Sequence, residues 1–268
     1  MKSDVAPLTL EEIQAPVSAE LNAVFEEIAA IVEADVPIIN DVSEHLLRIK
    51  GKLFRPTLLL LSARAVGKIT PKEITLGAVV ELIHLATLLH DDSVDHSALR
   101  RGQPTVNAEF SHEIAVIMGD YLYSRAIEQL VKLESQAALE IMSRVTNELT
   151  VGEMREVVSY EGLDFSEADY ETMILAKTAS LMAGACELGA LAGGPGWREP
   201  LRRFGTDLGA AFQIADDILD YSASSDVTGK PVGQDLREHK VTLPLIAVVP
   251  QLSAEERELL ESLMDNPD

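Results

Sequence analysis

The sequence predicts an all-α protein, a single-domain bundle of long helices. Apolar residues recur at three- and four-residue spacing along most of the 268 residues, and no convincing run of strand-like alternation appears. Ala, Leu, Glu, Ile and Val dominate, while aromatic residues make up only 4%, so aliphatic side chains must fill the core. Long helices joined by short connections favour one bundle.

Seven helical segments are expected, near residues 17–34, 54–66, 72–98, 106–133, 136–161, 166–192 and 198–222. Turn-forming residues separate them at Gly67–Pro71, Arg101–Pro104 and Gly193–Gly196. Thr70 and Ser166 are each followed three residues later by an acid, which is typical of a helix start. No shift in composition marks a domain boundary.

The segment 222–239 directly follows the last of these helices and reads SASSDVTGKPVGQDLREH. It is polar, and it contains Gly229, Pro231 and Gly233. A long loop beside a site is often a lid, but a plain surface connection accounts for the pattern equally well at this stage.

Composition excludes several classes of protein. A formal charge of −22 argues against nucleic acid as a partner, because phosphate backbones bind basic surfaces. Cys186 is the only cysteine, so no internal disulfide is possible and a cytoplasmic location is expected. The N-terminus lacks the pattern of a secretory signal, and no apolar stretch is expected to reach the roughly 20 residues that span a bilayer.

Two clusters of the form D-D-x-x-D are the most informative feature of the chain. The first comprises Asp91, Asp92 and Asp95, and the second Asp216, Asp217 and Asp220. On a helix the first and last carboxylates of each cluster lie one turn apart on one face. Two such faces turned toward each other would repel unless hard cations lay between them. The pattern therefore predicts a site for Mg²⁺ and a polyphosphate.

Basic and polar groups stand near these clusters. His84 precedes Asp91 by seven residues, so both lie on nearly the same helix face, and Arg100 and Arg101 follow the cluster. Lys177 lies within an apolar helical stretch, an unusual place for an unpaired lysine. Further basic residues at structured positions are Lys52, Arg55, Lys230 and Lys240. The alternative to a binding role is that His84 is a structural residue and that the two arginines are solvated at the surface.

Other chemistries lack their motifs. No Gly-Lys pair is followed by Ser or Thr, so no Walker A loop is present. The chain also lacks a dinucleotide-binding G-x-G-x-x-G and the G-x-S-x-G of hydrolases. A single cysteine offers no thiolate zinc site.

Five segments together resemble the trans-isoprenyl diphosphate synthase (polyprenyl synthetase) family. They are GKLFRP, HDDSVDHSALRRGQPTVN, LAKTASL, FQIADDILD and TGKPVGQDLREHKVTLPLI, in family order over about residues 50–246. The resemblance implies the isoprenoid synthase fold, with helices around a central cavity, a homodimer, and head-to-tail prenyl transfer. The pattern of small residues before the first cluster is similar to the medium- to long-chain members.

The resemblance also implies roles for particular residues. All six aspartates of the two clusters would hold Mg²⁺, roughly three ions per active site. Positions that match the isopentenyl diphosphate site are Lys52, Arg55, His84 and Arg101. Positions that match the allylic diphosphate site are Arg100, Lys177, Thr178, Gln213, Lys230 and Lys240. The residues expected to act in catalysis are Asp91, Asp95, Arg100, Lys177, Asp216 and Lys230.

The implied partners are isopentenyl diphosphate and an allylic primer, which is dimethylallyl, geranyl or farnesyl diphosphate. Loss of diphosphate leaves an allylic cation, the double bond of isopentenyl diphosphate attacks it, and the departing diphosphate can remove the proton. No protein nucleophile is needed, but water must be excluded.

Ala86 and Thr87, five and four residues before Asp91, are small and predict an open tunnel and a product of about C20 to C50. Candidates for the tunnel floor are Met118, Tyr121 and Leu122, although such residues are more often plain core.

The chain departs from the family pattern at a few positions. Lys50, Leu53 and His239 stand where the family usually has a glycine, a basic residue and a glycine. Typical members also continue beyond the position of Asp268, so the expectation is one domain over 1–268 without the usual C-terminal helices.

Two other functions stay open: a non-catalytic partner subunit of a heteromeric synthase, and a class I terpene cyclase. The pathway and the preferred primer are not indicated.

Overall fold

The computed structural model describes residues 7–48, 51–159, 165–222, 233–237 and 240–265. It divides into two compact units. Unit 1 comprises Met1–Leu139 and Ala185–Leu201, and unit 2 comprises Glu140–Gly184 and Arg202–Asp268. The helices that carry the chain from one unit to the other are α8 (Gln136–Ser159), α10 (Ser180–Ala190) and α11 (Arg198–Ser222).

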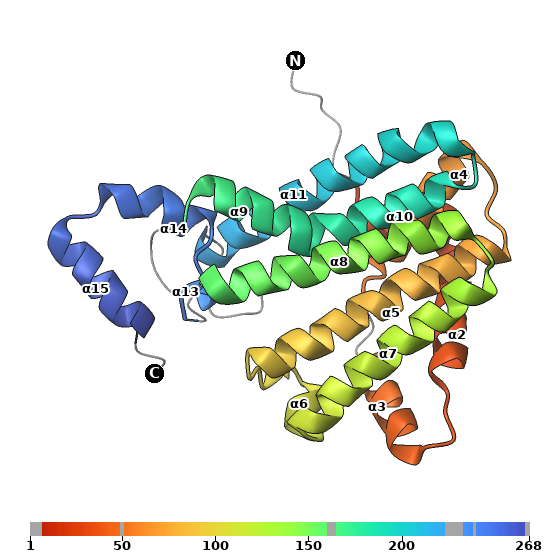
Figure 1. The fold of residues 1–268 in the computed structure, drawn as a ribbon, viewed down its shortest axis with the longest axis horizontal. Helices are drawn as coiled ribbons and strands as arrows, with labels where there is room; N and C mark the ends of the chain where they lie inside the picture. Colours follow the sequence, from red (N-terminus) through yellow and green to blue (C-terminus); the bar gives the residue numbers. More distant parts are fainter. Residues whose placement is uncertain (1–6, 49–50, 160–164, 223–232, 238–239, 266–268) are drawn as a thin grey trace. The chain divides into compact units, whose positions relative to one another are not determined.

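Unit 1 is a helical bundle with one short hairpin. Its further elements are α1 (Leu10–Gln14), η1 (Ala15–Val17), α2 (Ser18–Val32), α3 (Pro37–Arg48), α4 (Phe54–Val66), α5 (Pro71–Val94), β1 (Leu99–Arg100), β2 (Gln103–Pro104), α6 (Val106–Glu109), α7 (His112–Lys132) and η3 (Pro195–Trp197). Figure 1 shows α5 and α7 side by side along most of their length. Helices α2 and α4 also contact α5, which makes α5 the central helix of this unit.

The sequence explains where α5 begins and ends. Thr70 caps its N-terminus in a capping box with Glu73, whose carboxylate accepts hydrogen bonds from the Thr70 backbone N–H at 2.8 Å and from Oγ1 at 2.6 Å. At the other end, Asp95 is the C-cap, and His96 takes a positive φ of 50° that no helix can continue. The predicted helix 72–98 therefore begins one residue late and extends four residues too far.

The expectation that no apolar stretch is long enough to span a bilayer is wrong for helix α5. By length and composition it could cross a bilayer, although no stretch of the sequence was expected to approach that length. In the structure 61% of its most apolar window is buried inside the protein, as in the core helix of a folded domain.

Unit 2 contains the second half of the helices. Its further elements are α9 (Glu167–Ile174), η2 (Leu175–Ala179), α13 (Gln234–Arg237), α14 (Leu243–Val248), η4 (Val249–Gln251) and α15 (Ala254–Asp265). Tyr170, Met173 and Ile174 of α9 form a buried cluster against Ile214 of α11. Gly209 permits close packing of α11, because a Cβ there would lie 2.5 Å from Cα of Ala179.

Several other expected boundaries differ from the structure. The segment expected at 106–133 is split at Phe110, because Ser111 caps a new helix by accepting a hydrogen bond from the Ile114 N–H at 3.2 Å. The segment expected at 166–192 is interrupted by one π-helical turn, η2. Helices α1, α3, α13, α14 and α15 and the β1–β2 hairpin were not predicted from the sequence; each is short, so it offers few repeats from which a period can be read.

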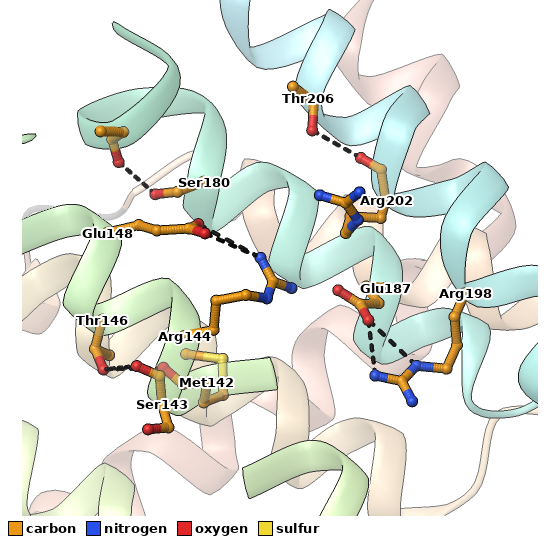
Figure 2. Close-up of polar contacts among 11 residues, drawn as sticks. Met142, Ser143, Arg144, Thr146, Glu148, Ser180, Glu187, Arg198, Arg202 and Thr206 are labelled. Carbon is orange, nitrogen blue, oxygen red and sulfur yellow. Dashed lines mark hydrogen bonds and ion pairs between the residues drawn. The ribbon is translucent and has the colours of Figure 1, made fainter. Parts of the chain in front are cut away.

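Two ion pairs outside the aspartate clusters each lie within one unit. In unit 1, the buried Glu187 accepts hydrogen bonds from Arg198 Nη2 at 2.9 Å and Nε at 3.2 Å (Figure 2). In unit 2, the half-buried Arg144 and Glu148 form an ion pair along α8 at 3.4 Å, which Figure 2 also shows. A buried carboxylate such as Glu187 requires a partner of this kind, so its contact with Arg198 is explained by the fold.

Candidate functional site

The first aspartate cluster lies on the last turn of α5. The Asp95 backbone N–H donates to the Asp91 carbonyl oxygen at 2.8 Å, so the helical spacing persists through the motif. Asp91 and Asp95 are therefore one turn apart on one face, as predicted. Asp91 is half-buried and Asp95 is exposed.

Asp92, the middle acid, is only 5% exposed and is bound by a guanidinium group. Arg100 donates from Nη2 to Oδ1 at 2.7 Å and from Nε to Oδ2 at 2.9 Å. Burial lowers the pKa of Arg100, but the hydrogen bond and charge of Asp92, with the charges of Asp91 and Asp95, raise it overall. Arg100 thus stays cationic beside the cluster.

A tight hairpin turn positions Arg100 and Arg101. Arg100 pairs with Gln103 in the β1–β2 ladder, so Arg101 and Gly102 are the two loop residues. Both have positive φ, 52° and 74°, as in a type I′ turn. An arginine in this left-handed conformation costs free energy, a cost that is common at functional sites.

Four predicted residues line one pocket in unit 1: His84, Asp92, Arg100 and Arg101. Burial, followed by the charges of three arginines, holds the pKa of His84 well below its ordinary value. One of those arginines is Arg55 in the first turn of α4. The pocket therefore combines two arginines and a histidine with the carboxylates of Glu81 and Asp92, and Asp92 is bound by Arg100. Its guanidinium groups are suited to binding a diphosphate.

The segment before α4 is fixed by its backbone. Leu53, the N-cap of α4, takes a left-handed conformation with φ 46° and ψ 38°. Gln14 of α1 donates from Nε2 to the Lys52 carbonyl oxygen at 2.7 Å and to Thr57 Oγ1 at 2.9 Å. Lys52 itself is exposed. The strained turn holds Lys52 and Arg55 on either side of Leu53.

The residues expected to control product length all lie in unit 1. Ala86 on α5 and Met118 and Leu122 on α7 are buried, and Thr87 is half-buried. The Tyr121 hydroxyl donates to the carbonyl oxygens of Val32 and Glu33, at 3.3 and 3.4 Å, where α2 ends. Tyr121 thus ties α7 to α2.

The second cluster lies near the end of α11 in unit 2. Asp217, again the middle acid, is only 4% exposed. Tyr170 donates from its hydroxyl to Oδ2 at 2.5 Å, and Gln213 donates from Nε2 to Oδ1 at 2.7 Å. Thr178 donates in turn to Gln213 Oε1 at 2.7 Å. Burial raises the pKa of Asp217, while the hydrogen bonds from Tyr170 and Gln213 oppose that rise.

Lys177 lies in the π-helical turn η2 and contacts two carboxylates of α8. Its Nζ lies 3.0 Å from Glu153 Oε2, and it also forms an ion pair with Glu156. Gly152 allows this approach, because a Cβ there would lie 2.6 Å from the Lys177 backbone nitrogen. Single π-helical turns are frequent at functional sites.

Asp220, the last acid of the second cluster, anchors the chain that returns after α11. Its carbonyl oxygen accepts from the Gly233 N–H at 2.9 Å, and its Oδ2 accepts from the Asp235 N–H at 3.1 Å. Lys240 is half-buried, and its N–H donates to the Asp235 carbonyl oxygen at 2.8 Å. Lys230, Lys50, His239 and most of the expected lid 222–239 lie outside the described residues.

The two clusters share one architecture. Each lies at the C-terminal end of a long helix, and each has a buried middle acid whose two oxygens accept hydrogen bonds from protein side chains. Within the described residues no group of three or more His, Cys, Asp or Glu side chains could hold a metal ion by itself. This arrangement fits Mg²⁺, which usually takes one or two carboxylates together with substrate phosphates and water.

Five residues with roles at the site were not found from the sequence: Gln14, Glu81, Glu153, Glu156 and Tyr170. Each acts on a predicted residue far away in sequence, so no local spacing identified it. The one usable signal was a lysine within an apolar helical stretch, and it pointed to Lys177 and not to its carboxylate partners.

Comparisons with known proteins identify the family of this chain. Residues 36–268 match the family model of the polyprenyl synthetases. The all-trans-nonaprenyl-diphosphate synthase (geranyl-diphosphate specific) of Rhodobacter capsulatus is 42% identical over 252 residues, which cover 93% of this chain and 78% of that protein. Heptaprenyl diphosphate synthase component 2 of Geobacillus stearothermophilus is 36% identical over 243 residues, 89% of this chain and 75% of that protein.

Solved structures show the same fold. The polyprenyl synthase from Caulobacter crescentus CB15, complexed with calcium and isoprenyl diphosphate, superposes with a TM-score of 0.91 at 38% identity. The match covers 97% of this chain and 80% of that one. The all-α fold is therefore the isoprenoid synthase fold, and the chain belongs to the polyprenyl synthetase family.

Proposed function

We propose that this chain, a prenyltransferase of the polyprenyl diphosphate synthase type, condenses isopentenyl diphosphate head-to-tail onto an allylic diphosphate and makes a linear trans-polyprenyl diphosphate. One observation carries the proposal. Each unit presents a D-D-x-x-D cluster at a helix end, with the middle acid buried and held by Arg100 in one unit and by Tyr170 in the other. Two such clusters suit a metal-bound diphosphate, because carboxylates and phosphate oxygens are the ligands that Mg²⁺ prefers.

In this proposal both clusters hold Mg²⁺ on the allylic diphosphate, as the family resemblance implies. Asp91, Asp95, Asp216 and Asp220 are the outer acids, and Asp92 and Asp217 are held behind them. When bound, the metal neutralises the diphosphate and stabilises its departure; roughly three ions per site are expected. The relative bound to calcium and isoprenyl diphosphate supports a divalent cation in this family.

The chain's own cations complete the leaving-group site. Arg100, Lys177, Lys230 and Lys240 are proposed to stabilise the charge that develops as the carbon–oxygen bond breaks. The hydroxyl–amide pair of Thr178 and Gln213 holds Asp217 in place. The double bond of isopentenyl diphosphate then attacks the allylic carbon, and the released diphosphate takes the proton.

The arginine-lined pocket of unit 1 is proposed to bind isopentenyl diphosphate. Arg101, Arg55 and Lys52 supply positive charge. His84 contributes as a neutral imidazole that donates one N–H, since burial and the neighbouring arginines hold its pKa well below the ordinary value. A neutral donor orients a phosphate oxygen without adding to the repulsion among the arginines.

A long product is proposed on the basis of Ala86. The small side chain lies one turn before the first cluster, where a large one would close a tunnel that begins there. The relatives named for nonaprenyl and heptaprenyl products are consistent with a product between C20 and C50.

We also propose a homodimer, which light scattering after size-exclusion chromatography tests directly.

A non-catalytic partner subunit is the second candidate, because one relative is named as component 2 of a heptaprenyl synthase. Both intact aspartate clusters favour catalysis over this reading. A terpene cyclase is the third candidate, but it would have no use for an isopentenyl diphosphate pocket.

One incubation separates the three. Purified protein is mixed with labelled isopentenyl diphosphate, Mg²⁺, and dimethylallyl, geranyl or farnesyl diphosphate in turn. A ladder of elongated prenyl diphosphates on reversed-phase chromatography, lost on chelation and in Asp91→Asn and Asp216→Asn, is the expected result. Cyclic hydrocarbons would indicate the cyclase. Absence of product, with activity only after a second subunit is added, would indicate the partner.

A further inference from the structure

Glu81 is a buried carboxylate in the arginine-lined pocket, and the mechanism above gives it no role. It lies on α5 one turn before His84, is only 5% exposed, and lines the pocket together with Gly51 and Arg101. Its Oε2 is buried and has no hydrogen-bond partner among the described residues. A buried, unbonded carboxylate oxygen is costly, so its position beside a phosphate pocket requires an explanation.

The carboxylate lies close to the chain at Gly51. A Cβ on Gly51 would be 3.2 Å from Glu81 Oε1 and 3.9 Å from Arg101 Nη1. One point in space therefore lies within 4 Å of both the carboxylate and the guanidinium. Glycine at position 51 leaves that space open between them.

Arg55 also has a buried polar atom without a partner, in its case a hydrogen-bond donor. Its Nε is buried and has no hydrogen-bond partner among the described residues. Burial lowers the pKa of Arg55, and the negative charge of Glu81 raises it. Arg100 differs, because Asp92 binds it directly at 2.7 Å. Glu81 thus acts by charge on Arg101, which lines the pocket with it, and on Arg55 in the first turn of α4; Asp92 occupies neither of these two guanidinium groups.

We propose that Glu81 is the resident counter-charge of the isopentenyl diphosphate pocket, and that the incoming diphosphate takes over its role as partner of Arg55 and Arg101. This inference rests on the proposed function of that pocket. Glu81 compensates Arg55 by charge without a hydrogen bond between them, so the N–H groups of the arginine stay available for phosphate oxygens. The cost is electrostatic repulsion between Glu81 and the bound diphosphate.

This role makes Glu81 a positioning residue with an unusual signature. Glu81→Gln keeps the size of the side chain and removes the charge. The free protein should unfold at a lower temperature, because Arg55 is then buried without compensation. Isopentenyl diphosphate should bind about tenfold more tightly, because the repulsion is gone.

The measurement is calorimetric titration with isopentenyl diphosphate in metal-free buffer, where binding at the aspartate clusters is disfavoured, together with thermal unfolding. Glu73→Gln is the matched control. Glu73 is also buried on α5, but it caps the helix through Thr70. It should lower the unfolding temperature without changing affinity. Glu81→Asp keeps the charge and should stay within about twofold of the parent affinity.

Weaker or unchanged binding in Glu81→Gln would overturn the proposal, since it would mean that Glu81 orients the arginines or does nothing for the pocket. If Glu81→Gln fails to fold, the double variant Glu81→Gln with Arg55→Met must fold, because it removes both charges; failure of the double variant as well would also overturn it. The elongation assay on the parent chain tests the proposed function separately, so the two results are independent.

Discussion

Tyr170 and Asp217 form a buried hydrogen bond in unit 2, with the tyrosine hydroxyl donating to Oδ2 at 2.5 Å. The two residues are 47 positions apart in sequence. The bond joins α9 to the second aspartate cluster on α11, so the orientation of that cluster depends on a residue outside any recognisable motif.

Tyr170→Phe removes this donor and leaves Asp217 with one partner fewer. A hydrogen bond to a charged group contributes about 1.5–3 kcal/mol, so the melting temperature should fall by several degrees. Prenyl transfer should fall roughly tenfold or more, because the cluster loses its fixed orientation. Calorimetry and the elongation assay measure the two effects. Tyr123→Phe, at a tyrosine 39% exposed on α7, is the control, and equal behaviour of the two variants would contradict the prediction.

His84 predicts how stability depends on pH. Burial and the charges of Arg55, Arg100 and Arg101 hold its pKa well below 6.5 in the folded protein. Below about pH 6.5 the unfolded chain takes up a proton at His84 and the folded chain does not, so protonation favours unfolding. The free energy of unfolding should therefore fall between about pH 7 and 5.5, by up to about 1.4 kcal/mol per pH unit from this residue.

Denaturant titrations across that range test the effect of His84. His84→Gln keeps a neutral hydrogen-bonding side chain but cannot titrate, so its stability should depend less steeply on pH. Parallel slopes for the parent and His84→Gln would rule out His84 as the source.

Gly119 on α7 makes room for His90, the residue directly before the first cluster. A Cβ at Gly119 would lie 2.3 Å from His90 Nε2, which itself lies 3.2 Å from the Val116 carbonyl oxygen. Gly119→Ala should destabilise the protein by about 1–3 kcal/mol and lower activity, since His90 must move and Asp91 with it.

Gly196→Ala provides the control for that variant, because a Cβ at Gly196 meets nothing within 4 Å. The double variant Gly119→Ala with His90→Ala should recover part of the lost stability, because the clash is removed. No recovery would place the cost elsewhere than at His90.

Ala86 tests the control of product length. The side chain is 2% exposed on α5, one turn before the first cluster. Ala86→Phe should shorten the product while isopentenyl diphosphate is still consumed, and Ala86→Leu should give an intermediate length. Overpacking costs about 1–3 kcal/mol, so melting temperatures are recorded alongside the products. An unchanged ladder on reversed-phase chromatography would show that Ala86 does not form the tunnel wall.

Much of the fold could be predicted from periodicity and turn chemistry. The expected segment at 54–66 coincides with α4, and that at 198–222 coincides with α11. Both have clear three- and four-residue spacing bounded by turn residues. Helix α3 and the β1–β2 hairpin were missed, because α3 buries only Val42 and Ser43 and each strand of the hairpin has two residues. Only contacts with neighbouring elements stabilise segments of this kind.

The candidate site, like the fold, could be predicted only in part. The equal spacing of both clusters and the proximity of His84, Arg100 and Arg101 followed from short stretches of sequence. The anchoring of Asp92 by Arg100, at 2.7 Å, did not, because the hairpin turn that returns Arg100 to the helix end is a property of the folded chain.

The amino-acid sequence alone determined that this protein is helical and that Asp91 and Asp95 lie one turn apart, because both follow from the geometry of a single helix. Tertiary structure decided which acid of each cluster is buried, that Tyr170 holds Asp217, and that Glu81 lies beside Gly51. Burial and long-range pairing depend on which helices pack together, and the spacing of residues along one helix carries no record of its neighbours.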